Sequence, residues 1–173
     1  MHNCKVIPIH RSYLIKLNQK AVFAREKGFS STRTDSLNQL LLYRYIRTFG
    51  FPCFCRVGTE GMNAVWLLTQ HSDNDINFQE DCLCYLDEIN KICPRRTRVL
   101  RSWLAYLCDR IAINRGEPQR FGTQYFRSSD GKLLRRPCKN IGTLWLRRLW
   151  AGLPPGLLEH WQLRRSCETR SKG

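Results

Sequence analysis

The stretch that decides the fold is LLTQHSDNDINFQ, residues 67–79, because one helical pattern ends inside it and another begins. His71 completes an apolar stripe with the i, i+3, i+4, i+7 spacing of one helix face: Ala64, Leu67, Leu68 and His71. A second stripe then follows at helical spacing: Phe78, Cys82, Leu86 and Ile89. Either Asp73 or Asp75 is expected to cap the second helix. The stretch therefore predicts two helices joined by a short polar turn.

Helical periodicity extends outward in both directions from this turn. It predicts helices over residues 10–27, from Asp35 to Thr48, from Gly61, over 99–114, from 141 to Gly152, and over 154–165. Residues 53–58 are expected to be extended, and Asp130-Gly131 between two strand-like runs predicts a β-hairpin turn. The prediction is a mainly α fold. It has one globular domain over residues 1–165 with one small β-hairpin, followed by a flexible basic tail over 166–173.

Length and composition narrow the class of protein. The 173 residues suffice for one domain, and no apolar run approaches the ~20 residues of a membrane span. The start of the chain shows no export signal, so a cytoplasmic protein without a membrane segment is expected. Its nine cysteines are odd in number and are predicted to be free thiols. The closest pairs have C-x-C spacing, unlike the C-x-x-C of zinc sites, so neither metal nor cofactor is predicted.

Positive charge is concentrated in the C-terminal half. Residues 1–93 hold 11 Lys/Arg against 9 Asp/Glu, whereas residues 94–173 hold 18 against 5, which together give the net charge of +15. An Arg-rich half favours an anionic partner such as nucleic acid, a nucleotide or an acidic protein. The alternative is a solvated basic face that binds nothing.

Four motifs occur in order along most of the chain: QHSD (70–73), AYLCDR (105–110), GEPQRFGTQY (116–125) and RRLWAGLPPGLLEH (147–160). Together with GFP (50–52) they resemble an uncharacterised bacterial family known only as a domain of unknown function. Its signature runs Q-H-x-D, then Y-L-x-D-R, then G-x-x-Q-x-[FY]-G-T-Q. The resemblance spans roughly residues 35–160 and implies a set of positions without a chemistry. The high cysteine content and positive charge do not belong to that pattern.

His71 and Asp73 are the first candidates for a functional role. A neutral imidazole can act as a general base, and a nearby carboxylate can orient it and stabilise the imidazolium. The alternative is structural: His71 bonds a neighbour in the core while Asp73 caps the next helix. A metal held by this pair would need a distant third ligand, and none is predicted.

The other candidates lie in the later motifs. Asp109 and Arg110 could supply an acid/base group and an anion clamp, or form an ion-pair network that fixes helix register. Gln119, Thr123 and Gln124 could bind a polar ligand. The alternative is a bulged hairpin in which Gln124 satisfies loop backbone. Arg56 is also expected to reach this region.

Two functions remain open from the sequence. The first is a small metal-independent enzyme, a hydrolase or group transferase, with His71 as base and a polar or anionic substrate. The second is a non-enzymatic protein that binds nucleic acid or an acidic partner through its basic half. Tryptophans near the end alternate with arginines, as in base-stacking surfaces or as core tryptophans with solvated arginines: Trp145, Trp150 and Trp161 with Arg147, Arg148, Arg164 and Arg165. No phosphate loop, G-x-S-x-G, H-E-x-x-H or G-x-G-x-x-G motif is present.

Overall fold

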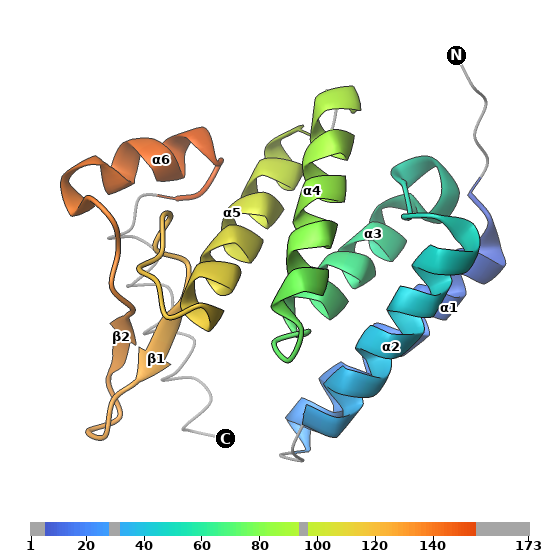
Figure 1. Ribbon diagram of the computed structural model, residues 1–173, viewed down its shortest axis with the longest axis horizontal. Coiled ribbons are helices and arrows are strands. Elements are labelled where there is room, and N and C mark those ends of the chain that lie inside the picture. The colour runs from blue at the N-terminus through green and yellow to red at the C-terminus, as the bar shows by residue number, and fades with distance from the viewer. Residues whose placement is uncertain (1–5, 28–31, 94–96, 155–173) are drawn as a thin grey trace. The chain divides into compact units, whose positions relative to one another are not determined.

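A computed structural model describes residues 6–27, 32–93 and 97–154 (Figure 1). Over these residues it contains six α-helices, a short 3-10 helix and one two-stranded hairpin, which confirms the mainly α prediction. The chain divides into two compact units, residues 1–85 and 86–173, with the boundary inside helix α4 (Ile76–Ile92). One domain over residues 1–165 therefore stays a prediction. The expected helix beyond Pro154 and the tail lie outside the described residues.

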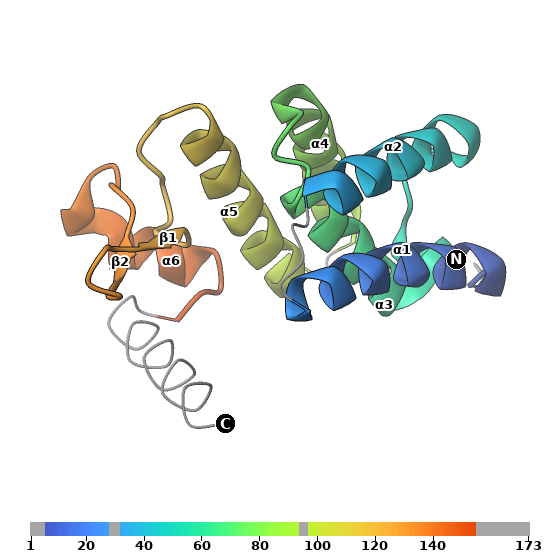
Figure 2. The ribbon, with the colours of Figure 1, turned by 90° about the horizontal axis from the view of Figure 1, so that it is seen from below.

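In the first unit, α1 (Pro8–Glu26), α2 (Thr32–Phe49) and α3 (Phe54–Gln70) pack against one another (Figure 2). Asn38 is 2% exposed, and its amide donates to the carbonyl of Leu17 at 3.1 Å, which ties α2 to α1. Each helix contributes apolar side chains to the shared core: Leu14, Leu17, Leu42, Tyr45, Val57, Met62, Val65 and Leu68.

Two predictions at the start of α2 and α3 are wrong. Asp35 is not the N-cap of α2, because the helix begins three residues earlier and Asp35 pairs from its first turn with Arg25 at 2.6 Å. Residues 54–57 are not extended but form one helical turn at the start of α3, and the long part of the helix follows the break at Gly58, close to the predicted start near Gly61. Gly58 has φ +68°, which breaks the helix after a single turn, and one turn is too short to show a period.

The sequence predicted either Asp73 or Asp75 as the cap of α4, and the structure supports Asp75. Asp75 caps α4, since its Oδ1 accepts a hydrogen bond from the backbone nitrogen of Phe78 at 3.0 Å. Ser72 closes the turn from the other side: its hydroxyl donates to the carbonyl of Leu68 at 2.9 Å. Asp73 is exposed between them.

The second unit contains α5 (Thr97–Asn114), strands β1 (Tyr125–Arg127) and β2 (Leu133–Arg135), η2 (Ile141–Thr143) and α6 (Leu144–Trp150). The strands pair antiparallel with Phe126 opposite Leu134, and Asp130-Gly131 lies in their connection as predicted. A small core joins α5 to the segments around it: Ala105, Phe121, Ala151 and Leu153.

Helix α6 reverses the predicted pattern of tryptophans and arginines. Trp145 and Trp150 are 57% and 58% exposed, whereas Arg148 is fully buried. The interpretation as core tryptophans with solvated arginines is therefore wrong for these residues, and Trp161, Arg164 and Arg165 lie outside the described part. Apolar spacing alone cannot show which face of a short helix turns inward.

None of the described helices has the length and hydropathy that a bilayer crossing requires. Within the same residues, no three His, Cys, Asp or Glu side chains gather as potential metal ligands.

Candidate functional site

The predicted site residues are divided between the two units. Three belong to the first unit: Arg56, His71 and Asp73. Five belong to the second unit, where the structure brings them together: Asp109, Arg110, Gln119, Thr123 and Gln124. A pocket shared by all eight stays a prediction.

Asp109 is fully buried on α5, and its carboxylate holds the loop that follows the helix. Oδ1 accepts from the backbone nitrogens of Arg120 at 2.7 Å and Phe121 at 2.9 Å. Oδ2 accepts from the backbone nitrogen and the hydroxyl of Thr123, both at 2.9 Å. A carboxylate offers about four lone-pair positions, so these donors use its bonding capacity. The contacts favour a structural role for Asp109 over a catalytic one.

The carbonyls of the same loop are held by two arginines of α6. The guanidinium of Arg148 donates to the loop carbonyls of Phe121 at 2.7 Å and Gly122 at 3.2 Å, and also to that of Pro154 after α6 at 2.8 Å. Arg147 donates to the carbonyl of Arg120 at 2.7 Å, and also to that of Lys139. The N–H groups of the loop therefore bond a carboxylate, and its C=O groups bond guanidinium cations. Both kinds of charge-assisted hydrogen bond stabilise the loop conformation.

Gln119, in the loop itself, is also fully buried, and its amide joins two chain segments. Its Nε2 donates to the carbonyls of Gln124 at 3.0 Å and Arg136 at 2.8 Å, and its Oε1 accepts from the backbone of Gln124 at 2.8 Å. The amide of Gln119 thus satisfies loop backbone, a role that the structural alternative assigned to Gln124. The amide of Gln124 has longer contacts, with Arg110 at 3.3 Å and the carbonyl of Tyr106 at 3.4 Å.

Glycine at position 122 lets the loop close. Its φ is +68°, and an added Cβ would lie 3.1 Å from Cδ of Arg135 and 3.3 Å from a methyl of Leu144. The F-G-T segment therefore needs glycine both for its backbone conformation and for the close approach of its neighbours.

Two thiols lie beside the loop, and neither is activated as a nucleophile. Burial raises the pKa of Cys108, and the adjacent Asp109 raises it further. Burial also raises the pKa of Cys138, and nearby Arg135 opposes that shift only in part. Because the thiolate is the reactive form, neither cysteine is poised for covalent chemistry at neutral pH.

In the first unit, the QHSD motif forms the turn after α3. His71 is half-buried and follows the last residue of the helix. Gln79 of α4 is fully buried, and its Nε2 donates to the carbonyl of Thr69 at 3.1 Å and to Asp73 at 3.4 Å. The amide nitrogen of Gln70 is buried and meets no acceptor among the described residues.

Arg56 lies at the opposite end of α3 from His71. It is in the first turn, where its guanidinium donates to the carbonyl of Phe49. The length of the helix separates the two residues, which does not favour a shared site.

The family is shown by comparison with known sequences, since residues 21–167 match one family throughout. The chain belongs to DUF6624, a family of unknown function. The match confirms the predicted resemblance and includes all eight predicted site residues. No curated protein and no solved structure matches the chain. Because DUF6624 is a family of unknown function, the chemistry has to be inferred from the site itself.

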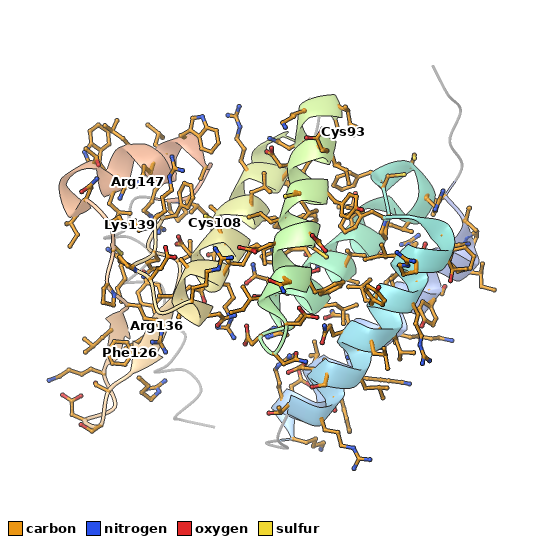
Figure 3. All side chains as sticks on the ribbon, viewed as in Figure 1. Cys93, Cys108, Phe126, Arg136, Lys139 and Arg147 are labelled. Carbon is orange, nitrogen blue, oxygen red and sulfur yellow. The ribbon has the colours of Figure 1, made fainter. Side chains whose placement is uncertain are left out.

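Sequence reasoning missed a surface on the hairpin of this DUF6624 protein. Phe126, Leu134 and Arg136 are exposed, whereas Tyr125, Leu133 and Arg135 are half-buried. Figure 3 shows Phe126 close to Arg136. The guanidinium of Arg136 lies over the ring of Phe126 at 5.5 Å. On the neighbouring pair, Arg135 lies over Tyr125 at 5.6 Å. We call Phe126, Leu134 and Arg136 the hairpin face. The sequence carries no signal for it, because neither YFR nor LLRR alternates apolar with polar residues.

Proposed function

We propose that this protein binds single-stranded nucleic acid through the second unit. The supporting observation is that the positive charge there is left uncompensated by carboxylates. Residues 97–154 hold 12 Lys/Arg and 3 Asp/Glu, a balance of +9. All three carboxylates are engaged: Asp109 by loop backbone, Glu117 by Lys139 at 3.2 Å, and Asp130 by Lys132 at 2.7 Å.

Exposed aromatic rings accompany this charge, which favours single strands over duplexes. Phe126 is 39% exposed on the hairpin face, and the indoles of Trp145 and Trp150 are more exposed still. Proteins that bind single strands without sequence preference combine a basic surface with aromatic rings on which bases stack. Arg136 on Phe126 and Arg101 on Trp150, at 5.0 Å, hold cations beside such rings.

The arginines divide into two groups under this proposal. Arg147 and Arg148 donate to loop carbonyls, so they stabilise the fold of this surface and are not the main phosphate contacts. Arg120 and Arg136 are exposed and can meet phosphates. A basic sequence pair is therefore a poor guide to which cations bind.

The test compares Phe126→Ala with Phe23→Ala, an exposed phenylalanine of α1 in the first unit. Affinity for a 20-nucleotide poly-U strand is measured by fluorescence anisotropy. Loss of one stacked base should weaken binding by about tenfold in Phe126→Ala and leave Phe23→Ala near wild type. Equal affinity of the two variants would contradict the proposal, as would binding of polyglutamate as tight as that of poly-U, which would indicate an acidic protein partner.

The predicted enzyme is a second candidate, favoured by one observation at the QHSD turn. A buried donor without an acceptor, such as Nε2 of Gln70, is unusual in a folded protein, and a bound molecule would supply the missing acceptor. His71 beside it would act as the general base on a polar or anionic substrate.

Native mass spectrometry of the purified protein tests this second candidate. A co-purifying small molecule that is lost in both Gln70→Leu and His71→Ala supports it. If no molecule co-purifies and Gln70→Leu is at least as stable as wild type, the donor is simply unsatisfied and the enzyme proposal fails.

A further inference from the structure

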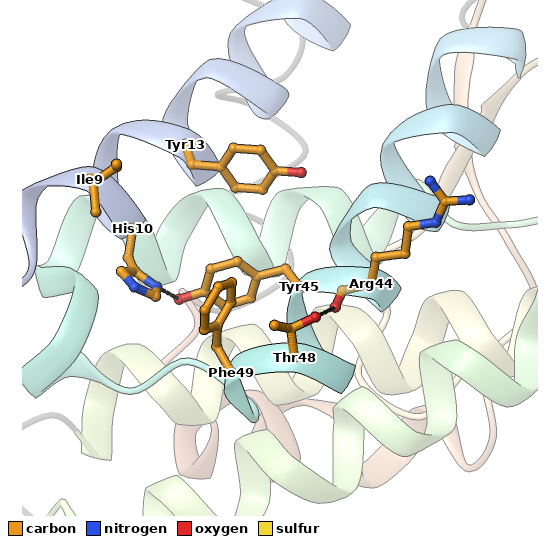
Figure 4. A pocket seen from close by; sticks show the side chains of 7 residues that line it. All are labelled: Ile9, His10, Tyr13, Arg44, Tyr45, Thr48 and Phe49. Carbon is orange, nitrogen blue, oxygen red and sulfur yellow. Dashed lines mark hydrogen bonds between the residues drawn. The ribbon is translucent and has the colours of Figure 1, made fainter.

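An open pocket of about 390 Å³ lies between α1 and α2 of the first unit (Figure 4). Its volume falls within the roughly 300–1,000 Å³ typical of small-molecule sites. It lies apart from the QHSD turn and from the motifs of the second unit, although Arg56 donates to the carbonyl of Phe49, one of its lining residues. Seven side chains line it: Ile9, His10, Tyr13, Arg44, Tyr45, Thr48 and Phe49.

Aromatic rings build the pocket: Tyr45 is buried at its base, whereas Tyr13 and Phe49 stay partly exposed. Tyr45 is 4% exposed, and the ring of Tyr13 lies nearly parallel to it, at 15° and 6.0 Å between centroids. Phe49 meets the ring of His10 edge-on at 4.7 Å. Tyr13 and Phe49 remain 39% and 48% exposed. A planar ligand would cover these faces and gain the stacking that aromatic pairs provide.

One hydrogen bond fixes the inner wall. Nδ1 of His10 and the hydroxyl of Tyr45 lie 2.6 Å apart (Figure 4). Burial raises the pKa of Tyr45 above its ordinary value, so the phenol stays neutral at pH 7. The bond locks the imidazole in place and leaves its second nitrogen without a partner among the described residues.

The charge of the pocket selects the sign of a ligand. Its lining includes Arg44 and neither Asp nor Glu. No carboxylate among the described residues pairs with Arg44. In Figure 4 the hydroxyl of Tyr13 points toward the side on which the Arg44 guanidinium lies. A carboxylate bound there would form charge-assisted hydrogen bonds with the guanidinium.

We propose that this pocket binds a small planar aromatic acid. Its ring lies against Tyr13, Tyr45 and Phe49, and its carboxylate meets Arg44. The inference is independent of nucleic-acid binding, because the pocket lies wholly in the first unit.

The probe for this pocket is 2-naphthoate, titrated into the full chain by isothermal calorimetry. Arg44→Gln should weaken binding about tenfold, because a charged hydrogen bond is lost. Arg47→Gln is the matched control. Arg47 is an exposed arginine three residues after Arg44 on α2 that does not line the pocket, so this variant should bind 2-naphthoate as the wild type does. The neutral analogue 2-naphthalenemethanol should bind about tenfold more weakly than the acid.

A second pair of variants tests the aromatic wall. Tyr13→Ala should lose most of the affinity for 2-naphthoate, whereas Tyr43→Ala, an exposed tyrosine of α2 outside the pocket, should retain it. Circular dichroism verifies that each variant is folded. The proposal is overturned if 2-naphthoate gives no saturable binding at millimolar concentration, or if the alcohol binds as well as the acid. Equal affinity of Arg44→Gln and Arg47→Gln, or full affinity in Tyr13→Ala, would also overturn it.

Discussion

At the scale of single residues, the motif positions of the second unit divide by burial. Asp109 and Gln119 are fully buried and bond backbone groups, whereas Gln124 and Arg110 are half-buried and have longer contacts. The sequence placed these residues in one cluster but could not separate the two roles. A carboxylate that holds peptide N–H groups and one that abstracts a proton look the same in a motif.

Replacement of Asp109 by alanine distinguishes these roles. Its buried donors, three backbone N–H groups and a hydroxyl, would lose their acceptor, so we expect a loss of about 3 kcal/mol or more in unfolding free energy. Urea denaturation measures this loss. Asp130→Ala, at the exposed hairpin turn, is the control and should unfold close to wild type. If Asp109→Ala keeps wild-type stability, the structural role is wrong.

Reactivity toward alkylation tests burial at Cys82. Burial raises its pKa to about 12; a hydrogen bond with Thr69 lowers the pKa by a smaller amount, and the charge of Asp81 raises it. At pH 8 its thiol therefore stays protonated, and iodoacetamide should modify the exposed Cys84 well before Cys82. Fragment-ion mass spectrometry of the shared peptide measures both sites. Equal rates at the two cysteines would show that the α4 core face is open to solvent.

At the scale of elements, periodic stretches were predictable and short breaks were not. The helices around the QHSD turn and the Asp130-Gly131 hairpin follow from apolar spacing and turn chemistry. The helical turn before Gly58 did not, because a single turn carries no period. The orientation of α6 was mispredicted for a different reason. Arg148 turns inward because loop carbonyls require donors there, and this requirement cannot be seen in the spacing of apolar residues.

The start of α4 offers a test at this scale. Asp75 accepts from the backbone of Phe78 and, at 2.7 Å, from the amide of Gln39. Loss of an N-cap typically costs about 1 kcal/mol, so Asp75→Ala should lower the unfolding free energy by that amount. Asp73→Ala, two residues earlier and exposed, should cost less. Thermal unfolding measures both variants. A larger loss of stability in Asp73→Ala than in Asp75→Ala would show that Asp75 is not the cap.

At the scale of the whole molecule, the chain separates a charge-balanced part from a basic one. The imbalance was visible in the sequence, since residues 94–173 hold most of the excess Lys/Arg. Which cations face solvent was not, because Arg147 and Arg148 are used within the fold while Arg120 and Arg136 are exposed. The pocket between α1 and α2 was also hidden, since its residues come from two helices with no shared motif.

The salt dependence of poly-U binding tests the central claim most directly. Each phosphate contact on a single strand contributes about −0.7 to the slope of log affinity against log salt concentration. We predict a steep negative slope for the wild type, reduced by about 1.4 in Arg120→Gln/Arg136→Gln. The control Arg33→Gln/Arg47→Gln, two exposed arginines of α2, should keep the wild-type slope. An affinity independent of salt, or the same slope in both double variants, would contradict nucleic-acid binding by the basic unit.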